Sequence, residues 1–503
     1  MKKIFITLII LTGAIFAWQN NNRVTMPPDY VFQGKVGPEY SGFRSSPGET
    51  VGTTWMDWQY NGSCDKYMYW PTVSAAFHFY WTFMLSSGPN SRRTFYNYFY
   101  PPDYWLGPTQ VDNLTSRMGA LDGLEDGRAI CTAHHTTTNN VPTFYIDASE
   151  GAGSFTQHEI PPGSIPPADQ PIWPKPCADT INHRIWVSGS QSYAGVGWVT
   201  YTDNEGQTWA TWTNTLGGVP LDADHFDAGG REVWITSPNG KVALINNDGT
   251  YLDYHYWETT NNGATWTHNY VFHQNIPPDS VIGYIWCDAV YDNSNNLHVV
   301  FTCIDTVGQG SGGSGWRSLI RHWNQGTGQI SLVASGWYEV TPGPGSNHPT
   351  VSECQVGINR VTGDLYCTWC KADPSDIAQN GLANLDIWGA RSTDNGVTWI
   401  EQRNITNSQT PGAPPGQCDD DRYQTLNSEV KNAAGGDTLF LFYLNSKDAG
   451  GGYFPPDPGA TMTEDPLLFY AYAWNPTGIE ETVNSQSAIV NGFSQSIQEC
   501  HRH

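Results

Sequence analysis

One eight-residue pattern recurs along this chain and constrains the fold more than any other feature. Its fullest copy is Ser392-Thr-Asp-Asn-Gly-Val-Thr-Trp399. Asp394 and Asn395 can hydrogen-bond their own backbone, and Gly396 adopts a positive φ at low cost, so the pattern predicts a tight turn. Threonine and tryptophan favour β-structure, so the chain is expected to re-enter a strand after the turn.

Two further copies keep the same residue types at the same offsets: Thr202-Asp-Asn-Glu-Gly-Gln-Thr-Trp209 and Thr259-Thr-Asn-Asn-Gly-Ala-Thr-Trp266. Asn324-Gln-Gly326 resembles a fourth copy that has lost its tryptophan. Successive glycines are about 57, 63 and 70 residues apart, a spacing typical of four-stranded blades. The sequence therefore predicts an all-β fold, a β-propeller of four-stranded blades, with seven blades preferred and six as the alternative.

The pattern Ser/Thr-x-Asp-x-Gly-x-Thr-Trp resembles the Asp box, or BNR repeat, of sialidase-type β-propellers. The resemblance implies that each copy joins the two outer strands of a blade and that the chain is a secreted, non-catalytic member of that superfamily. Only one copy keeps the aspartate, and asparagine replaces it in the other two. A structural role is implied for Asn204, Gly206, Trp209, Asn261, Gly263, Trp266, Asp394, Gly396 and Trp399.

Sialidase catalysis does not carry over to this chain. The family uses three arginines, a tyrosine nucleophile with a glutamate, and an aspartate, and it carries a Phe/Tyr-Arg-Ile-Pro signature. The nearest match is Phe43-Arg-Ser-Ser-Pro47, which has one extra residue and no isoleucine. Arg44 is therefore not assigned a catalytic role.

Composition and termini indicate an exported protein with one large domain. The formal net charge of −24 argues against nucleic acid or an anionic membrane as partner. Residues 1–17 have a basic start and a short apolar core, as in a secretory signal peptide, and no second candidate transmembrane segment follows. We expect a lead-in over 18–50, the propeller over 51–474, its first blade within 51–100, and a polar tail over 475–503.

The tail allows two interpretations. Pro476-Thr-Gly-Ile-Glu-Glu481 resembles the junction that precedes C-terminal sorting domains of type IX secretion, and the alternative is a frayed terminus. Ten cysteines in an exported chain suggest disulfides. Cys287 with Cys303, and Cys354 with Cys367, flank predicted hairpin turns at equal distances, so these two pairs are the disulfide candidates.

Polar residues precede several predicted inner strands, where propeller loops converge on the channel mouth. We expect a binding pocket there for a sugar or a cation, and the alternative is a solvated rim of turn-capping aspartates. The candidate residues are Asp224, His225, Asp288, His348, Asp420 and Arg422. No cofactor is expected, although Asp419-Asp-Asp421 could form a calcium loop rather than a solvated turn.

The favoured function is a secreted or cell-surface module that binds an extracellular glycan or protein, or that self-assembles. The alternative is a sialidase-like or other glycoside hydrolase at the channel mouth. Two carboxylates about 5 to 10 Å apart in one cleft would favour the hydrolase, whereas an aromatic platform without them would favour binding.

Overall fold

The computed structural model of this protein describes twelve segments of the chain. They are residues 14–15, 45–60, 66–71, 74–85, 92–101, 103–135, 141–191, 195–273, 281–305, 315–432, 436–452 and 457–474. Most of the expected signal peptide, most of the lead-in and all of the tail lie outside these residues. Among the described residues, no helix is long and apolar enough to cross a membrane.

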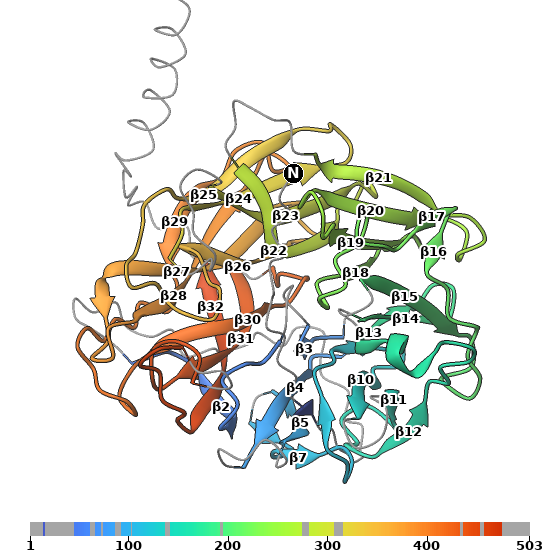
Figure 1. Cartoon of the computed structure of the whole chain (residues 1–503), viewed down its shortest axis with the longest axis horizontal. Helices are drawn as coiled ribbons and strands as arrows, with labels where there is room; N and C mark the ends of the chain where they lie inside the picture. The colour runs from blue at the N-terminus through green and yellow to red at the C-terminus, as the bar shows by residue number, and fades with distance from the viewer. Residues whose placement is uncertain are drawn as a thin grey trace, which may run out of the picture.

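Seven antiparallel blades form a closed ring in the described part of the chain (Figure 1). This confirms the predicted all-β propeller and its seven blades. The first three blades differ in strand length, and β1 (Ala14–Ile15) pairs with β8 of the second. Their strands are β3 (Met68–Tyr69), β4 (Phe77–Met84), β5 (Arg92–Tyr100), β6 (Tyr104–Trp105) and β7 (Thr109–Gln110); β8 (Ser116–Arg117), β9 (Leu121–Gly123), β10 (Ala129–His135), β11 (Pro142–Asp147) and β12 (Phe155–Glu159); and β13 (Ile172–Asp179), β14 (Arg184–Gln191) and β15 (Val196–Thr202).

The 3₁₀-helix η2 (Pro167–Asp169) precedes the third blade, and the hairpin β16 (Thr215–Leu216) and β17 (Val219–Pro220) follows it. The last four blades each have four strands. These are β18 (Val233–Thr236), β19 (Val242–Asn247), β20 (Tyr254–Thr259) and β21 (Thr267–Phe272); β22 (Val281–Tyr291), β23 (Leu297–Asp305), β24 (Ser318–Asn324) and β25 (Ile330–Gly336); β26 (Val351–Ile358), β27 (Leu365–Ile377), β28 (Ala383–Ser392) and β29 (Ile400–Asn404); and β30 (Asp420–Leu426), β31 (Asp437–Ser446), β32 (Asp465–Trp474) and β2 (Glu49–Thr54).

The ring closes through strands from opposite ends of the chain. Strand β2 pairs antiparallel with β32 and completes blade seven, so it is not part of the first blade as the sequence suggested (Figure 1). Aromatic side chains then seal the seam between blades seven and one. The rings of Phe77 and Phe440 lie 4.7 Å apart, and those of Phe79 and Phe442 lie 5.3 Å apart. Each fully buried phenylalanine contributes about 1.5–3 kcal/mol.

The three recurring turns occupy equivalent places, directly after the third strand of blades three, four and six, and in blades four and six they lead into the fourth strand. In the blade-six turn, the Ser392 hydroxyl accepts a hydrogen bond from the Gly396 amide at 2.9 Å, and Asp394 accepts one from the Thr398 amide at 2.9 Å. The other two turns repeat both contacts with asparagine in place of aspartate. The three glycines have φ between 79° and 86°, which explains why glycine stands there.

Because successive strands run antiparallel, connections alternate between the two faces of the ring. The recurring turns and the first-to-second-strand turns lie on one face, which we call the repeat-turn face. The second-to-third-strand turns and the links between blades lie on the other, which we call the connection face. Inner strands such as β13, β26 and β30 are buried at every residue, because neighbouring blades cover both of their sides.

The strand registers correct the disulfide prediction. Strands β22 and β23 pair without a bulge from Tyr291 opposite Leu297 back to Cys287, so that Phe301 rather than Cys303 lies opposite Cys287. The register of β26 with β27 places Val356 opposite Cys367, and Cys354 falls within the bulge between Ser352 and Gln355. Both registers differ from the symmetric pairing about the turn that the prediction assumed. Cys287, Cys303, Cys354 and Cys367 are all buried thiols.

Candidate functional site

Four inner strands carry a bulge near their connection-face ends, where the channel mouth forms. The bulges lie in β13, β22, β26 and β30. Three bulge residues have positive φ values between 51° and 54°: Trp173, Glu353 and Tyr423. Bulges re-aim side chains, and a positive φ in a bulky residue is strained backbone of a kind that concentrates at functional sites. This end of the channel is therefore a candidate site.

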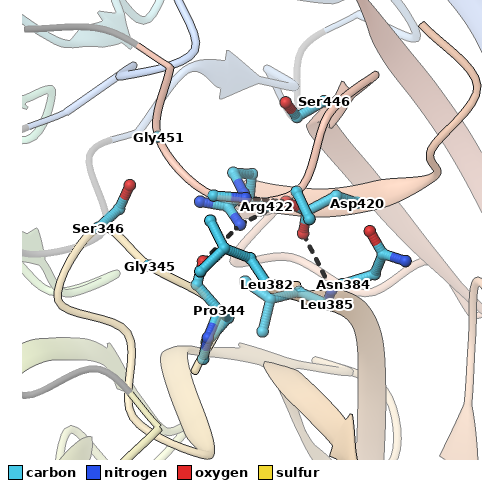
Figure 2. A network of polar contacts seen from close by, with 12 residues as sticks. Pro344, Gly345, Ser346, Leu382, Asn384, Leu385, Asp420, Arg422, Ser446 and Gly451 are labelled. Atoms are coloured by element: carbon cyan, nitrogen blue, oxygen red, sulfur yellow. Dashed lines mark hydrogen bonds and ion pairs between the residues drawn. The ribbon is translucent and has the colours of Figure 1, made fainter. Parts of the chain in front are cut away.

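A buried ion pair organises the blade-seven side of the mouth (Figure 2). The Arg422 guanidinium pairs with the Asp420 carboxylate and donates a hydrogen bond to the Pro344 carbonyl at 3.0 Å. Asp420 also accepts a hydrogen bond from the Leu385 amide at 2.9 Å. Burial raises the pKa of Asp420 to about 6, and the charge of Arg422 opposes that shift. The Nε and Nη1 atoms of Arg422 have no hydrogen-bond partner among the described residues.

A second buried pair lies on the blade-six side. Glu353 contacts the Nε2 atom of His348 at 2.5 Å and accepts a hydrogen bond from the Gln424 amide at 3.2 Å. Burial alone would raise the pKa of Glu353, but His348, together with the Cys370 thiol, lowers it. The His348 ring stacks on Trp286, with ring centroids 4.9 Å apart. This arrangement favours the ionised carboxylate.

The segment before β3 covers the mouth. Asp57 accepts a hydrogen bond from the Gly452 amide, and the Tyr60 ring lies edge-on to Tyr423 with centroids 4.9 Å apart. Burial, followed by repulsion from Asp465, raises the pKa of Asp57 to about 8. All six polar groups of this channel-mouth cluster are at most 4% exposed: Asp57, His348, Glu353, Asp420, Arg422 and Tyr423. The cluster has the groups for acid–base chemistry, and all of its side chains are buried.

The structure brings together three of the six residues predicted to line a pocket: His348, Asp420 and Arg422. Asp288 lies further along the channel, where it accepts a hydrogen bond from the Val356 amide of the next blade at 3.1 Å. Asp224 and His225 belong to the connection-face edge of blade four. There Asp224 accepts a hydrogen bond from Thr250 at 2.9 Å, and His225 contacts Asp222 at 2.8 Å.

Sequence reasoning missed Asp57, Glu353 and Tyr423. Glu353 offered one signal, since a glutamate within the otherwise uncharged strand Val351–Ile358 must find a partner when buried. The aspartates of the predicted calcium loop turn to different partners. Asp419 contacts Lys447 at 2.6 Å, and Asp421 accepts hydrogen bonds from Ser46 and Ser408, both at 2.7 Å. Within the described segments, no group of three or more acidic, histidine or cysteine side chains has an arrangement suited to a metal ion.

Two grooves open elsewhere, each beside one of the recurring turns. The first, of about 280 Å³, lies between blades two and three, and we call it the charged groove. Arg128 bridges Asp126 and Glu205 there, and Arg184 contacts Asp203 at 2.6 Å. Its lining comprises Leu124, Glu125, Asp126, Arg128, Ala178, Asp179, Thr180, His183, Arg184, Ile185, Asp203, Asn204, Glu205 and Gln207.

The second groove, of about 520 Å³, lies between blades five and six, and we call it the neutral groove. None of its lining side chains carries a charge. Its exposed apolar part comes from Ile330, Leu332 and Val397, with Trp399 buried to 7% exposure behind them, and the rest from amides, hydroxyls and a glycine. The lining comprises Asn324, Thr327, Gln329, Ile330, Ser331, Leu332, Ser335, Asn395, Gly396, Val397, Thr398 and Trp399.

No protein-family model matches the chain, and no curated protein is similar to it at a significant level. Several solved structures are similar in fold. A polysaccharide lyase has a TM-score of 0.42 and 11% identity, over 91% of this chain and 97% of that one. An α-L-arabinofuranosidase from Fusarium graminearum has a TM-score of 0.41 and 10% identity, over 69% and 91%. A Hadza microbial sialidase has a TM-score of 0.37 and 13% identity, over 76% and 74%. At these values the likeness assigns no family.

Proposed function

We propose that this protein is a secreted or cell-surface propeller that binds a neutral glycan in the neutral groove. The observation that carries the proposal is the lining of that groove, which joins a tryptophan and aliphatic side chains to amides and hydroxyls without any carboxylate or cation. Sugars present apolar C–H faces and many hydroxyls, so this mixture suits them. The groove volume also falls within the range of small-ligand sites, about 300–1,000 Å³.

The groove wall is held in place before any ligand arrives. The Trp399 indole donates a hydrogen bond to the Ser331 hydroxyl at 3.2 Å, and its ring meets His322 edge-on at 5.4 Å. Ile330 and Leu332 are each 41% exposed, and Val397 is 54% exposed. Apolar surface is therefore available beside fixed polar groups, which lowers the ordering cost of binding.

Charge favours a neutral ligand over an acidic one. The chain carries a net charge of −24, which repels polyanions at long range. The groove itself offers no arginine or lysine to pair with a carboxylate or sulfate. A charged ligand would lose hydration there without gaining an ionic partner.

Hydrolysis at the channel mouth is the less favoured function. Asp57 and Glu353 are candidate acid–base groups, and the raised pKa of Asp57 would suit a general acid. Both carboxylates are nevertheless buried, Glu353 at the channel mouth and Asp57 within the segment that ends at Tyr60. Opening this site would move the segment and Asp57 with it, whereas the neutral groove is already open.

A glycan array with the full chain, run beside a reducing-sugar release assay, tests the proposal. We expect binding to neutral glycans and no turnover. Val397→Glu places a carboxylate in the groove and is expected to weaken binding at least about tenfold. Val361→Glu makes the same change at a position that is 77% exposed in a turn of blade six outside the groove, and should bind as the parent does. Equal binding by both variants, or release of sugar, would refute the proposal.

A further inference from the structure

Two histidines and an aspartate form a buried chain directly behind the neutral groove. Asp292 lies 3.5 Å from Nε2 of His298, and Nδ1 of His298 lies 2.8 Å from Nε2 of His322. Nδ1 of His322 lies 3.1 Å from the carbonyl oxygen of Gly396, which belongs to the groove lining. Both imidazoles are at most 1% exposed. The chain thus runs from the carboxylate of blade five to a turn of blade six.

The ends of this chain fix how many protons it holds. A carboxylate and a carbonyl can only accept hydrogen bonds, so each of the three gaps between them needs one proton from an imidazole. Two neutral imidazoles carry only two such protons. The hydroxyl of Ser331 is the alternative donor to His322, but it lies 2.6 Å from the Gly396 oxygen and 3.4 Å from the His322 nitrogen. The Ser331 hydroxyl therefore donates its proton to the Gly396 carbonyl oxygen and not to His322. The hydrogen-bonded series from Asp292 to Gly396 is then one proton short.

We infer that His298 is a buried imidazolium paired with Asp292, that His322 is the neutral Nδ1–H tautomer, and that this extra proton holds the wall of the neutral groove in place. Every gap is then filled: His298 donates to Asp292 and to His322, and His322 donates to Gly396. The protonation state stands on geometry alone, whereas its effect on a ligand rests on the proposed function.

The surroundings agree with a single charge on His298. Burial, then the neighbouring His298, lowers the pKa of His322 to about 3, so a second proton is excluded. Burial opposes ionisation of Asp292, but hydrogen bonds from His298 and Asn296 lower its pKa to about 2. Other charged groups on the packed elements face elsewhere. Asp394 is bonded to Thr398 within its own turn, and Arg321 lies over the Phe272 ring.

Blade four contains a matched chain that needs no extra proton. Asp248 lies 3.1 Å from His255, which lies 2.9 Å from His268. The two imidazole rings are 5.1 Å apart and nearly parallel, as they are in blade five. Nδ1 of His268, however, meets no acceptor among the described residues. Two neutral imidazoles fill its two gaps, so this chain serves as an internal control.

The extra proton affects the groove because Gly396 packs on the His322 ring. A Cβ atom added to Gly396 would lie only 1.9 Å from Cε1 of that ring. Loss of the proton leaves either the Asp292 gap or the Gly396 gap without a hydrogen bond. The turn that carries Asn395, Val397 and Trp399 then loses a tie to blade five. Glycan affinity should therefore fall as the pH rises.

Histidine side-chain ¹⁵N NMR on the full chain tests the protonation state. At about pH 7.5, above the ordinary histidine pKa of about 6.5, we expect His298 to carry protons on both ring nitrogens. His255 and His268 should show the neutral pattern. Each signal is assigned by its loss in a His→Gln variant, and a fold check by circular dichroism accompanies each spectrum. A neutral His298 in the folded protein would overturn the inference.

The Asp292→Asn variant provides a second and more specific test. Its amide can donate to His298, so all three gaps are filled by neutral groups and the imidazolium should disappear. Affinity for a neutral oligosaccharide is expected to fall about fivefold between about pH 6 and pH 9 in the parent and to stay constant in Asp292→Asn. Asp248→Asn should behave as the parent does. If the affinity of the parent does not depend on pH, the extra proton does not control the groove. If no glycan binds at all, the proposed function is refuted. The NMR result then decides the protonation state by itself.

Discussion

The two grooves lie beside turns built on the same eight-residue pattern, yet their contents differ completely. In the charged groove, the variable positions of the turn are Asp203, Glu205 and Gln207, and ion pairs with Arg128 and Arg184 occupy the space between blades. In the turn beside the neutral groove, the same positions hold the uncharged residues Thr393, Asn395 and Val397, and the last two line the groove. The fixed residues shape the turn, and the variable residues decide whether it ties two blades together or offers a surface to a ligand.

The largest expected effect concerns the fixed glycine. Gly396→Ala combines a positive φ of 82° with a Cβ atom 1.9 Å from His322, so we expect a loss of about 3 kcal/mol in the free energy of unfolding. Gly206→Ala, the matched change beside the charged groove, meets Phe144 at 2.8 Å and should cost less. Urea unfolding measures both. A larger loss for Gly206→Ala would show that the two turns are not packed as described.

Exchanging the variable positions tests whether they set the chemistry of the groove. The triple variant Thr393→Asp, Asn395→Glu and Val397→Gln installs the blade-three residues in the blade-six turn. The backbone should accept them, because Glu205 already adopts a φ of 56° where Asn395 adopts 63°. We expect glycan affinity to fall about thirtyfold, or about 2 kcal/mol, measured by isothermal calorimetry. Unchanged affinity would show that the side chains of the groove lining do not determine glycan binding.

Unfolding free energy measured as a function of pH tests the channel mouth independently of both grooves. The folded-state pKa of Asp57 is about 8, above its ordinary value, so the folded protein binds more protons than the unfolded chain across neutral pH. The stability it contributes is present below about pH 4 and is lost as the pH rises through about 8. Asp57→Asn should reduce the fall in unfolding free energy over this window by up to about 1.4 kcal/mol per pH unit. At each pH, Asp57→Asn should bind glycan as the parent does, and a loss of binding in this variant would point back to the channel mouth.

The smallest expected effect is the loss of one ion-pair network. Arg128→Ala removes contacts to Asp126 and Glu205 in the charged groove. Because these carboxylates are partly exposed, the change should cost no more than about 1 kcal/mol of stability in urea unfolding. Binding to neutral glycans should be unaffected. Weaker binding in this variant would mean that the charged groove also takes part in recognition.

Periodic features of the chain were predictable, and features that depend on which strands pair, and in which register, were not. The recurring turns predicted the ring and the strands around them because their spacing reports the blade repeat. Strand β2 was misplaced, because its sequence shows that it is a strand but not which sheet it joins. The disulfide pairs failed on the registers of β22 with β23 and of β26 with β27, which local propensity does not fix.

The candidate site was predictable only in part for a related reason. His348, Asp420 and Arg422 meet because their loops enter adjacent blades. Asp224 and His225 lie apart from them. This was not predictable, because the distance of a loop residue from the propeller axis cannot be read from its position in the chain. The neutral groove was not predicted, because its side chains are ordinary strand and turn residues. They form a site only because two blades bring them together.

The position of a bound neutral oligosaccharide in a crystal structure of the complex tests the central claim most directly. The ligand is expected between blades five and six, in contact with Gln329, Val397 and Trp399. Density for the ligand at the channel mouth beside Tyr423, with the segment before β3 displaced, would contradict this account and favour a hydrolase.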